Sequence, residues 1–400
     1  MKFLFYVEPV TFRFDPFALR QWLLWISDMV RAQRVGGRGP TFAFVSSPWL
    51  CRAFEAEVGE DVDLIAVQPA EVLAPFDMDR ASYWQDLARP GNATPRNMPL
   101  QQALAAAVDA FRPDAIISFS QNRYLQSLRS RTNVFFTELQ PLPRIAGAAG
   151  FFFDNSGHQT ESLLVAHSAR IKALSLPETV SARAKSWWSA NFRDAVDCHP
   201  DIAQIGGWIA SAAEGHPVVM LALQPPDWLT LEGLSTATPL DGLLMRWLSE
   251  LPTGWRAIAT YHPVFRLSRT IEETIAEQFP NLLLLPETWN QGKSELALDA
   301  VEAVATVSSA IGFTALLAGK RVIALGTSNL SGFASSTLAD LATVSSLTAP
   351  ERINLLAFLT NAYCHGSRDI LAGPGYLTRI LSEIIEGGTA RYFDFSRELS

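Results

Sequence analysis

The hydrophobic residues in the second half of the chain fall into short runs separated by segments of helical period. The runs are rich in Val, Ile, Leu and Ala, as buried strands of parallel sheets are. The segments between them repeat apolar residues about every three to four positions, which predicts helices with one buried face. The pattern predicts strands at 217–223, 256–261, 282–285, 303–307 and 321–325, and helices at 240–251, 270–279 and 311–318. Because strands alternate with helices, this half is expected to be a Rossmann-type α/β domain.

The first half has a similar pattern with less regular connections. It predicts strands at 3–7, 41–46, 62–67, 114–119 and 133–136, and helices at 15–34 and 100–111. Residues 69–96 show no period and are expected to form a surface excursion. Residues 170–217 are helical in pattern and are expected to link two domains. The predicted fold is therefore α/β with two Rossmann-type domains, at 1–200 and 201–400.

The stretch 301–327 predicts one strand–helix–strand unit with a polar turn. Ser308 and Ser309 follow its first strand, Gly312 stands near the helix start, and Gly319 ends the helix. A helix N-terminus offers unpaired backbone N–H groups and the positive end of the helix dipole, which suit a phosphate or a carboxylate. The alternative is that the two serines only cap a core helix.

Polar residues follow four of the predicted parallel strands of this half. They are Gln224 with Asp227, His262 with Pro263, Glu287, and the pair Ser308-Ser309. In open α/β sheets, ligands bind beyond the carboxyl ends of the strands, so these motifs are expected to converge on one site. The structural alternatives are a loop histidine bonded to a carbonyl for His262 and a turn or N-cap aspartate for Asp227.

Composition narrows the classes of function. The formal net charge of −8 argues against a general nucleic-acid binder, because affinity for the phosphate backbone comes mainly from clustered Lys and Arg. No segment reaches the roughly 18 apolar residues needed to cross a bilayer. Glu8 interrupts the apolar N-terminal run too early for a signal peptide, so the protein is expected to be cytoplasmic. The helix at 15–34 is apolar on most sides and is compatible with a membrane-surface helix, but its thin basic face favours a core helix.

Two segments resemble the bacterial β-Kdo transferases of capsule and O-antigen synthesis, where Kdo is an acidic eight-carbon sugar. The run VSSAIGFTALLAGKRVIALG is similar to the donor-binding segment of that family, and Gln224 to Asp227 and His262-Pro263 match its Gln-Pro and His-Pro motifs. Upstream, TELQPLPRIAGAAGFFFDNSGHQTES resembles the Glu-to-Arg segment of the family and the aromatic strand after it. The absence of a duplicated module makes the chain more similar to the single-module O-antigen enzymes.

The resemblance implies a GT-B glycosyltransferase with a donor crevice between two domains. The first domain would bind a glycan acceptor, which could be lipid-linked, and the second would bind the donor CMP-Kdo. The donor site would comprise Gln224, His262, Pro263, Glu287, Ser308, Ser309, Gly312, Phe313 and Thr314. No metal and no cofactor are expected, because CMP leaves as a stable anion and no carboxylates show metal-ligand spacing.

The resemblance also implies retention of the β configuration, which requires two displacements at the anomeric carbon and a nucleophile on the enzyme. Asp227 is the expected nucleophile, and His262 would neutralise the departing phosphate. The acceptor base is expected among Glu138, Asp154, His158 and Glu161, and Arg144 is expected to face the cleft between the domains. For each of these first-domain residues a purely structural role in a turn is an open alternative.

Two other functions stay open at this point. One is an inverting transferase that uses CMP-sialic acid or a UDP-sugar, which needs a base but no nucleophile. The other is a non-catalytic protein that binds a nucleotide or a polysaccharide. Attachment to the membrane would come through other biosynthesis proteins or through the first helix.

Overall fold

A computed structural model describes the protein at residues 1–10, 16–34, 39–59, 62–88, 98–119, 122–147, 149–225 and 239–395. The chain forms two compact units, and each is described here by itself. Unit 1 contains Met1–Gln140, Ala149–His158 and Ala362–Asp394. Unit 2 contains Pro141–Ala148, Gln159–Asn361 and Phe395–Ser400. The chain thus passes between the units more than once, whereas the sequence pattern predicted a single boundary at residue 200.

Unit 1 is built on a seven-stranded sheet of order β12-β6-β5-β4-β1-β2-β3. The first five strands along the chain are parallel, and β6 and β12 pair antiparallel at one edge. The strands are β1 (Lys2–Tyr6), β2 (Thr41–Ser46), β3 (Asp63–Ala66), β4 (Ala115–Ser118), β5 (Asn133–Leu139), β6 (Gly150–Asp154) and β12 (Cys364–Gly366). All five strands predicted in the first half are present, because runs buried on both faces of a sheet leave a clear apolar signal.

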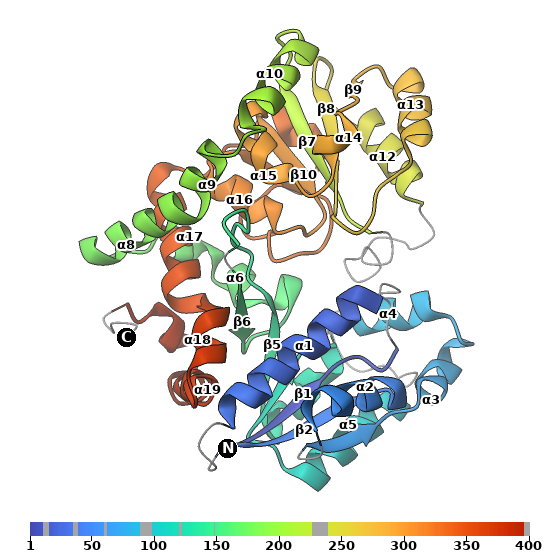
Figure 1. Ribbon diagram of the computed structural model, residues 1–400, viewed down its shortest axis with the longest axis vertical. Helices are drawn as coiled ribbons and strands as arrows, with labels where there is room; N and C mark the ends of the chain where they lie inside the picture. Colours follow the sequence, from blue (N-terminus) through green and yellow to red (C-terminus); the bar gives the residue numbers. More distant parts are fainter. Residues whose placement is uncertain are drawn as a thin grey trace. The chain divides into compact units, whose positions relative to one another are not determined.

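Helices cover this sheet, and the last of them come from the end of the chain (Figure 1). The helices of unit 1 are α1 (Pro16–Gln33), α2 (Pro48–Val58), α3 (Pro69–Leu73), α4 (Arg80–Ala88), α5 (Met98–Phe111), η3 (Arg123–Ser130), α18 (Ser367–Ala372), α19 (Tyr376–Gly387) and the short turns η1 (Ala74–Phe76) and η10 (Gly388–Phe393). In α1, Ile26, Met29 and Val30 are fully buried, so this segment is a core helix. Among the described residues, no helix is both long enough and apolar enough to cross a membrane.

Residues 69–88 are helical, and the prediction of a surface excursion there is wrong. Tyr83, Trp84 and Leu87 of α4 are at most 1% exposed, and Tyr83 packs edge-on against Phe76. The polar composition of 69–96 hid this helix, because its buried side chains Tyr83, Trp84 and Leu87 stand at helical spacing over little more than one turn, too short a run to establish a period.

Unit 2 carries a five-stranded parallel sheet of order β11-β10-β7-β8-β9. Its strands are β7 (Val218–Leu223), β8 (Arg256–Tyr261), β9 (Leu282–Leu283), β10 (Ala303–Thr306) and β11 (Arg321–Ala324). When the five strands are numbered by their order in the chain, they lie across the sheet in the order 5-4-1-2-3, which is the doubly wound Rossmann order. The α/β prediction with two Rossmann-type units, as in the GT-B fold, is confirmed.

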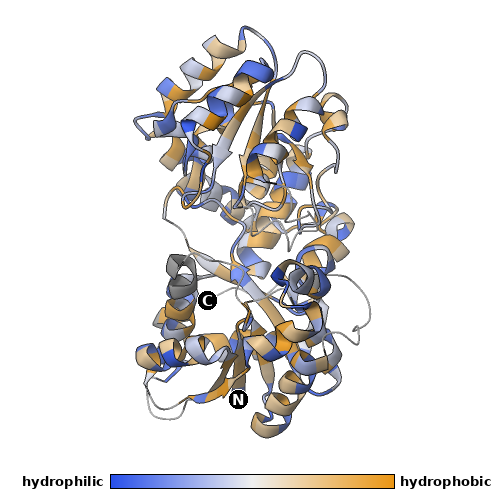
Figure 2. Ribbon diagram, turned by 90° about the vertical axis from the view of Figure 1, so that its right-hand side faces the viewer, coloured by the Kyte–Doolittle hydropathy of each residue, from blue (hydrophilic) through white to orange (hydrophobic). Residues whose placement is uncertain are grey.

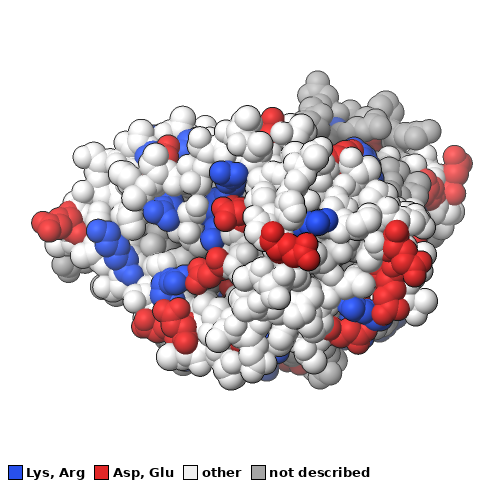
Figure 3. All heavy atoms as spheres, turned by 90° about the horizontal axis from the view of Figure 1, so that it is seen from above, with Lys and Arg blue, Asp and Glu red and all other residues white. Residues whose placement is uncertain are grey.

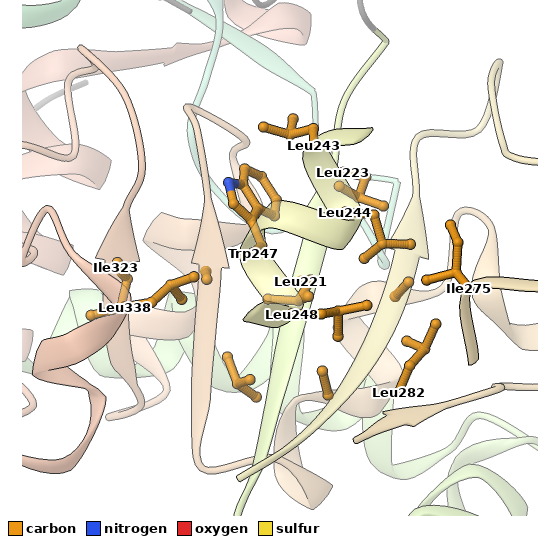
Figure 4. Close-up of a cluster of buried hydrophobic side chains, with 14 of the residues drawn as sticks. Leu221, Leu223, Leu243, Leu244, Trp247, Leu248, Ile275, Leu282, Ile323 and Leu338 are labelled. Carbon is orange, nitrogen blue, oxygen red and sulfur yellow. The ribbon is translucent and has the colours of Figure 1, made fainter. Parts of the chain in front are cut away.

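One face of the unit 2 sheet is covered by α12 (Leu240–Ser249), which packs directly over β7. Leu244, Trp247 and Leu248 of this helix lie against Leu221 and Leu223 of the strand (Figure 4). Most strand segments of the chain are apolar throughout, whereas the helices carry polar residues along one side (Figure 2). This contrast is what produced the sequence pattern, since a strand between two helical layers has no solvent face.

The remaining helices of unit 2 extend from residue 159 to residue 363. They are η4 (Gln159–Glu161), α6 (Leu163–Ala166), α7 (Ser168–Lys172), α8 (Glu178–Trp188), η5 (Ser189–Arg193), α9 (Asp194–Asp197), α10 (Ile202–Ala213), α13 (Arg269–Gln278), α14 (Glu287–Asn290), α15 (Ser294–Ala297), η7 (Leu298–Ala300), α16 (Ile311–Leu317), η8 (Leu338–Ala342), α17 (Ala349–Phe358) and η9 (Leu359–Tyr363). Helices α7 and α8 pack against α17, so the segment expected to be a linker is part of the body of unit 2.

Helix α16 ends in a glycine turn that the sequence had marked. Gly319 has φ +80, its N–H donates to the carbonyl of Leu316, and the N–H of Lys320 donates to the carbonyl of Ala315. These two bonds form a Schellman motif, which satisfies carbonyls that the helix leaves unpaired. A Cβ atom on Gly319 would also lie 2.3 Å from Nη1 of Arg352.

We expect the substitution Gly319→Ala to destabilise unit 2 by about 1–2 kcal/mol, because an L-residue is strained in the left-handed region. The measurement is urea denaturation followed by tryptophan fluorescence. The matched control is Gly207→Ala, inside helix α10, where an added Cβ meets no atom within 4 Å and alanine should stabilise by up to about 1 kcal/mol. Equal shifts for the two variants would contradict the role of the left-handed turn.

Candidate functional site

The sheet of unit 2 has one point where the strand order reverses, between β7 and β10. The connections that leave these two neighbouring strands run to opposite sides of the sheet, so their loops diverge beyond the strand ends. Gln224 and Pro225 follow β7, and Ser308 and Ser309 follow β10. Of the four polar motifs that the sequence placed at strand ends, those of Gln224 and of Ser308-Ser309 therefore lie at the switch point of a parallel sheet.

The two diverging loops are joined by the side chain of Gln224. Its Oε1 accepts the backbone N–H of Ser308 at 2.9 Å, and its Nε2 donates to the Ser308 Oγ at 3.2 Å. Gln224 is 7% exposed, so this pair of bonds is shielded from water. The amide of Gln224 thus fixes the serine turn.

The serine turn has a second support beneath it. Thr306 is fully buried; its hydroxyl donates to the carbonyl of Ala222 at 2.9 Å and faces the N–H of Ser309 at 3.4 Å. Thr306 and Gln224 together fix both serine N–H groups by side-chain acceptors. The carboxyl end of β10 is therefore tied to the end of β7 at two levels.

Helix α16 begins just after the serine turn and is packed closely at its start. A Cβ atom on Gly312 would lie 2.5 Å from Cδ1 of the buried Leu330, so a larger residue here would force the Leu330 side chain to shift. Phe313 and Thr314 are 0% and 1% exposed, and Phe313 packs against Phe333. Their side chains belong to the core of unit 2, so any part they take in a ligand site is played through the placement of the helix.

His262 heads a tight turn beyond the carboxyl end of β8. The N–H of Val264 donates to Nδ1 of His262 at 3.3 Å, and the N–H of Phe265 donates to its carbonyl at 3.0 Å. Because Nδ1 accepts this bond, the neutral imidazole carries its proton on Nε2. His262 is therefore set to present an N–H donor from Nε2.

The His262 turn is held in place by the next loop of the sheet. Nε2 of Gln291 donates to the carbonyls of Pro263, at 2.7 Å, and His262, at 3.3 Å. The N–H of Gly292 donates to the carbonyl of Tyr261, which extends the parallel bridge from Tyr261 to Gln291. Pro263 itself is exposed at the tip of this braced turn.

Glu287 begins α14, beyond the carboxyl end of β9. Its Oε2 lies 3.3 Å from Nη2 of Arg266, and both side chains are about 40% exposed. An exposed pair of this kind contributes little to stability. The pair does bring a guanidinium group to the same edge of the sheet as His262.

Asp227 follows Gln224 by three positions in the sequence and lies outside the described residues. The described part of this loop ends at Pro225, directly after the residue that is tied to Ser308. The nucleophile assignment for Asp227 stays a prediction.

The candidate bases of unit 1 have different surroundings. In unit 1, Nε2 of His158 lies 3.6 Å from Oε2 of Glu138, and the ring of His158 meets Phe136 edge-on. Asp154 is completely buried and accepts the N–H groups of Ser156 and Gly157. It also accepts the hydroxyl of Tyr363 at 2.9 Å.

These contacts separate the candidates by their chemistry. The carboxylate of Asp154 closes the turn after β6, which is the structural alternative raised for it. Glu138 is partly exposed and paired with an imidazole, as a general base would be. Glu161 is exposed on the single turn η4 and, like Arg144, belongs to unit 2.

Arg144 lies in a loop that is anchored through its backbone. The N–H of Arg144 donates to Oε1 of Glu295 at 2.9 Å, and Arg144 is exposed. Burial raises the pKa of Glu295, while its bonds to the N–H groups of Arg144 and Ile145 oppose the shift. The anchor was not foreseen, because nothing in the sequence links residues 144 and 295.

The described residues form neither a continuous basic surface on the face shown in Figure 3 nor a cluster of metal ligands. Basic and acidic side chains are interspersed over the described part of the face shown in Figure 3, where a duplex-binding protein would carry a continuous basic surface. Among the described residues, no three His, Cys, Asp or Glu side chains are grouped as ligands for a metal ion.

Several solved structures are similar to this chain at low identity. The β-Kdo 2,7 transferase part of KpsC from Thermosulfurimonas dismutans is 10% identical with a TM-score of 0.43, over 94% of this chain and 100% of that one. HepE from Anabaena, in complex with UDP and glucose, is 14% identical with a TM-score of 0.34, over 96% and 99%. A putative UDP-N-acetylglucosamine 2-epimerase from Listeria monocytogenes is 12% identical with a TM-score of 0.34, over 97% and 96%.

The sequence itself matches no family profile and no characterised protein. The identities and scores of the similar structures are too low to assign a family. The function is therefore argued from the residues of this chain.

Sequence reasoning missed three residues that shape the site, namely Thr306, Gln291 and Arg266. Thr306 is the last residue of a strand, and a hydroxyl at that position in an otherwise apolar run is the signal that could have found it. Gln291 precedes a glycine with positive φ, which marks a turn. Arg266 had no signal beyond its nearness to His262.

We expect the substitution Gln224→Leu to destabilise unit 2 by about 1–3 kcal/mol, because it leaves the shielded N–H of Ser308 without its acceptor. Urea denaturation measures the loss, and hydrogen exchange of peptides that contain 306–312 should show the unprotected turn. Gln278→Leu, on the exposed face of α13, is the matched control and should change stability by less than about 0.5 kcal/mol. Unchanged exchange of 306–312 in Gln224→Leu would show that the amide does not hold the turn.

Proposed function

We propose that this chain is a retaining glycosyltransferase that transfers Kdo from CMP-Kdo to a bacterial surface glycan. The observation that carries the proposal is the bond pair between Gln224 and Ser308. It fixes Gln224, three positions before Asp227 in the sequence, against the serine turn at the switch point of unit 2. The likeness of both segments to the β-Kdo transferase motifs supplies the substrate class.

The first step is attack by the Asp227 carboxylate on the anomeric carbon of Kdo. A bond forms between an Asp227 oxygen and this carbon while the bond from the carbon to the phosphate oxygen breaks, and CMP leaves with the electron pair. Attack on the face opposite the phosphate inverts the configuration once. A carboxylate suits a centre with oxocarbenium character because it stabilises the developing positive charge.

His262 acts on the leaving group in this step. The bond from the Val264 N–H to Nδ1 directs the proton of the neutral ring to Nε2, so Nε2 donates a hydrogen bond to the departing phosphate. The brace from Gln291 holds the turn, and such preorganised donors act without reorganising during the reaction. The serine hydroxyls at 308 and 309 and the guanidinium of Arg266 are further groups that would bind the two negative charges of the donor.

The second step transfers Kdo to the acceptor. The acceptor hydroxyl attacks the same carbon, the bond to Asp227 breaks, and the carboxylate is regenerated. The hydroxyl proton passes to a base of unit 1, for which the pair of Glu138 and His158 is the best candidate because its groups are partly exposed and in contact. Two inversions give net retention of the β configuration.

We expect a covalent adduct on Asp227. Incubation with fresh CMP-Kdo, followed by intact-protein mass spectrometry and peptide mapping, should show one added Kdo on the peptide that contains Asp227. Asp227→Asn should form no adduct and should lose transfer by at least about 10³-fold while it still binds CMP, because only the nucleophile is removed. The matched control is Asp241→Asn, in the first turn of α12, which should form the adduct normally.

Other outcomes of this experiment point to the other functions. Transfer without an adduct, and with inverted product, would indicate an inverting enzyme, and competition between CMP-Kdo, CMP-sialic acid and UDP-sugars would identify its donor. Saturable CMP binding with neither adduct nor CMP release would indicate a non-catalytic binding protein. Near-normal turnover in Asp227→Asn would reject the nucleophile assignment.

Two substitutions at His262 separate its donor role from its role in the turn. The amide nitrogen of glutamine can take the place of Nε2, whereas the amide oxygen of asparagine can take the place of Nδ1. If donation to the phosphate matters, His262→Gln should keep more activity than His262→Asn, which should lose about 10²–10³-fold in kcat. Steady-state kinetics with saturating CMP-Kdo measures both.

The opposite order of activities would show that the bond to Val264, rather than donation to the phosphate, is what the reaction needs. Thermal denaturation of both variants serves as the control, because a loss of fold would lower both activities together.

A further inference from the structure

Unit 1 has a switch point of its own, between β1 and β4. In its strand order these two strands are neighbours, and the connections that leave them diverge to opposite sides of the sheet. Glu8 follows β1, and Asn122 follows β4 and caps η3. By the same topological rule that locates the site of unit 2, this edge is where unit 1 would bind a ligand.

A carboxyl group is buried at this point and surrounded by donors. Glu8 is 2% exposed, and its Oε2 accepts the hydroxyl of Tyr6 at 2.5 Å. Its Oε1 accepts the hydroxyl of Tyr83 from α4, and the amide of Asn122 lies 3.5 Å from Oε2. The end of β1, the loop after β4 and α4 therefore meet on one carboxyl group.

The network continues into the first turn of η3. Nδ2 of Asn122 donates to the hydroxyl oxygen of Tyr6 at 2.9 Å, and its Oδ1 accepts the N–H of Tyr124. Asp86 of α4 accepts the hydroxyl of Tyr124 and lies 3.3 Å from Nη2 of Arg123. In the described part of unit 1, the titratable and charged groups of this network around Glu8 include Tyr6 on β1, Tyr83 and Asp86 on α4, and Arg123 and Tyr124 on η3.

Stability alone does not explain a buried polar network of this size at a sheet edge. Burial of a carboxylate is unfavourable, and apolar packing would serve stability as well or better. Buried ionisable groups with shifted pKa values concentrate at functional sites. The catalytic steps proposed above use none of these residues.

Glu8 is set to change its charge near neutral pH. Burial raises the pKa of its carboxyl from 4.5 to about 7, and the bonds from Tyr6, Tyr83 and Asn122 oppose the shift. The pKa values of Tyr6 and Tyr83 are raised well above 10, chiefly by burial and then by the nearby Glu8, so both hydroxyls stay protonated. They can therefore donate to the carboxylate throughout the physiological range.

We propose that Glu8 is a positioning residue for glycan binding by unit 1, in which its ionised carboxylate ties the β1 and β4 loops to α4. The assignment of a glycan rests on the proposed function, in which unit 1 takes the acceptor. Protonation loosens this tie. Both carboxyl oxygens accept tyrosine hydroxyls, and a hydrogen bond to an ionised acceptor is about twice as strong as a neutral one, so a proton on either oxygen weakens the tie.

The two effects of protonation on the molecule have opposite signs. A pKa raised from 4.5 to about 7 in the folded state means that the folded protein binds the proton more tightly than the unfolded chain. The stability from this group is fully present below pH 4.5 and is lost as the pH rises through 7. The hydrogen bonds from Tyr6 and Tyr83 to Glu8 strengthen over the same pH range. The ionised form therefore has a lower free energy of unfolding but a better ordered switch point.

The first test is amide hydrogen exchange by mass spectrometry at pH 6, 7 and 8, corrected for intrinsic exchange rates. Peptides that cover 6–10 and 122–130 should become about ten-fold more protected from pH 6 to pH 8 in the wild type, and Glu8→Gln should show the pH 6 level throughout. Glu272→Gln removes the buried carboxyl of α13 in unit 2, which is 4% exposed, and should leave the response of unit 1 unchanged. Identical pH responses in wild type and Glu8→Gln would overturn the proposal.

A second variant guards against a failure of Glu8→Gln to fold. Tyr83→Phe keeps the edge contacts of the ring with Phe76 and Trp84 and removes only the hydroxyl. With one donor fewer, the carboxylate is less favoured, so the exchange transition should move to higher pH. An unmoved transition would show that Glu8 is not the group that titrates.

The last measurement is the KM for the acceptor as a function of pH. In the wild type, KM should fall about ten-fold from pH 6 to pH 8, and in Glu8→Gln it should stay at the high value while CMP binding is unchanged. A change in kcat with constant KM would contradict a positioning role in glycan binding. If no transfer is found with any donor, the proposed function fails, but the exchange experiment still decides whether Glu8 orders the switch point.

Discussion

The structure depends on one topological constraint, which is that a parallel strand can be followed only by a crossover to one side or the other of its sheet. In both units the chain begins in the middle of the sheet, builds toward one edge, then returns to the other side of the first strand. The reversal leaves two adjacent strand ends with no covering element between them. The polar residues that tie each reversal, Gln224 and Ser308 in unit 2 and Glu8 and Asn122 in unit 1, lie just beyond these strand ends.

The two units close this gap by different chemistry. Unit 2 uses a neutral amide and a hydroxyl, which bond with the same geometry at every pH of interest. Unit 1 uses a carboxyl group among tyrosines, whose bonding depends on its charge. Under the proposed function, unit 2 holds a highly charged donor, and an invariant tie suits it because the charge of the ligand already dominates the local field. Under the same proposal unit 1 takes an uncharged hydroxyl, which a charge-dependent tie suits.

The sequence predicted the strands well because strands buried on both faces leave continuous apolar runs. It predicted that Gln224, His262 and Ser308 lie at one edge of the sheet, since that follows from the parallel order of the strands and from the positions of these residues in the chain. It did not predict the bonds between these residues, because the contact between residues 224 and 308 depends on the rotamers of side chains 84 residues apart. The sequence did not predict the buried network around Glu8, because its partner Tyr83 lies in a segment whose helix the hydrophobic pattern did not reveal.

The return of the chain to unit 1 has a consequence for biosynthesis. Strand β12 pairs with β6, and Tyr363, which directly precedes β12, donates to Asp154, which is 209 residues earlier. A ribosome therefore releases β6 long before its edge partner, and the sheet of unit 1 carries an unpaired edge while the whole of unit 2 is made. Unpaired edges invite association with other chains. Pairing of β12 with β6 thus covers this edge last, and nascent chains of this protein are expected to need a chaperone until β12 has paired.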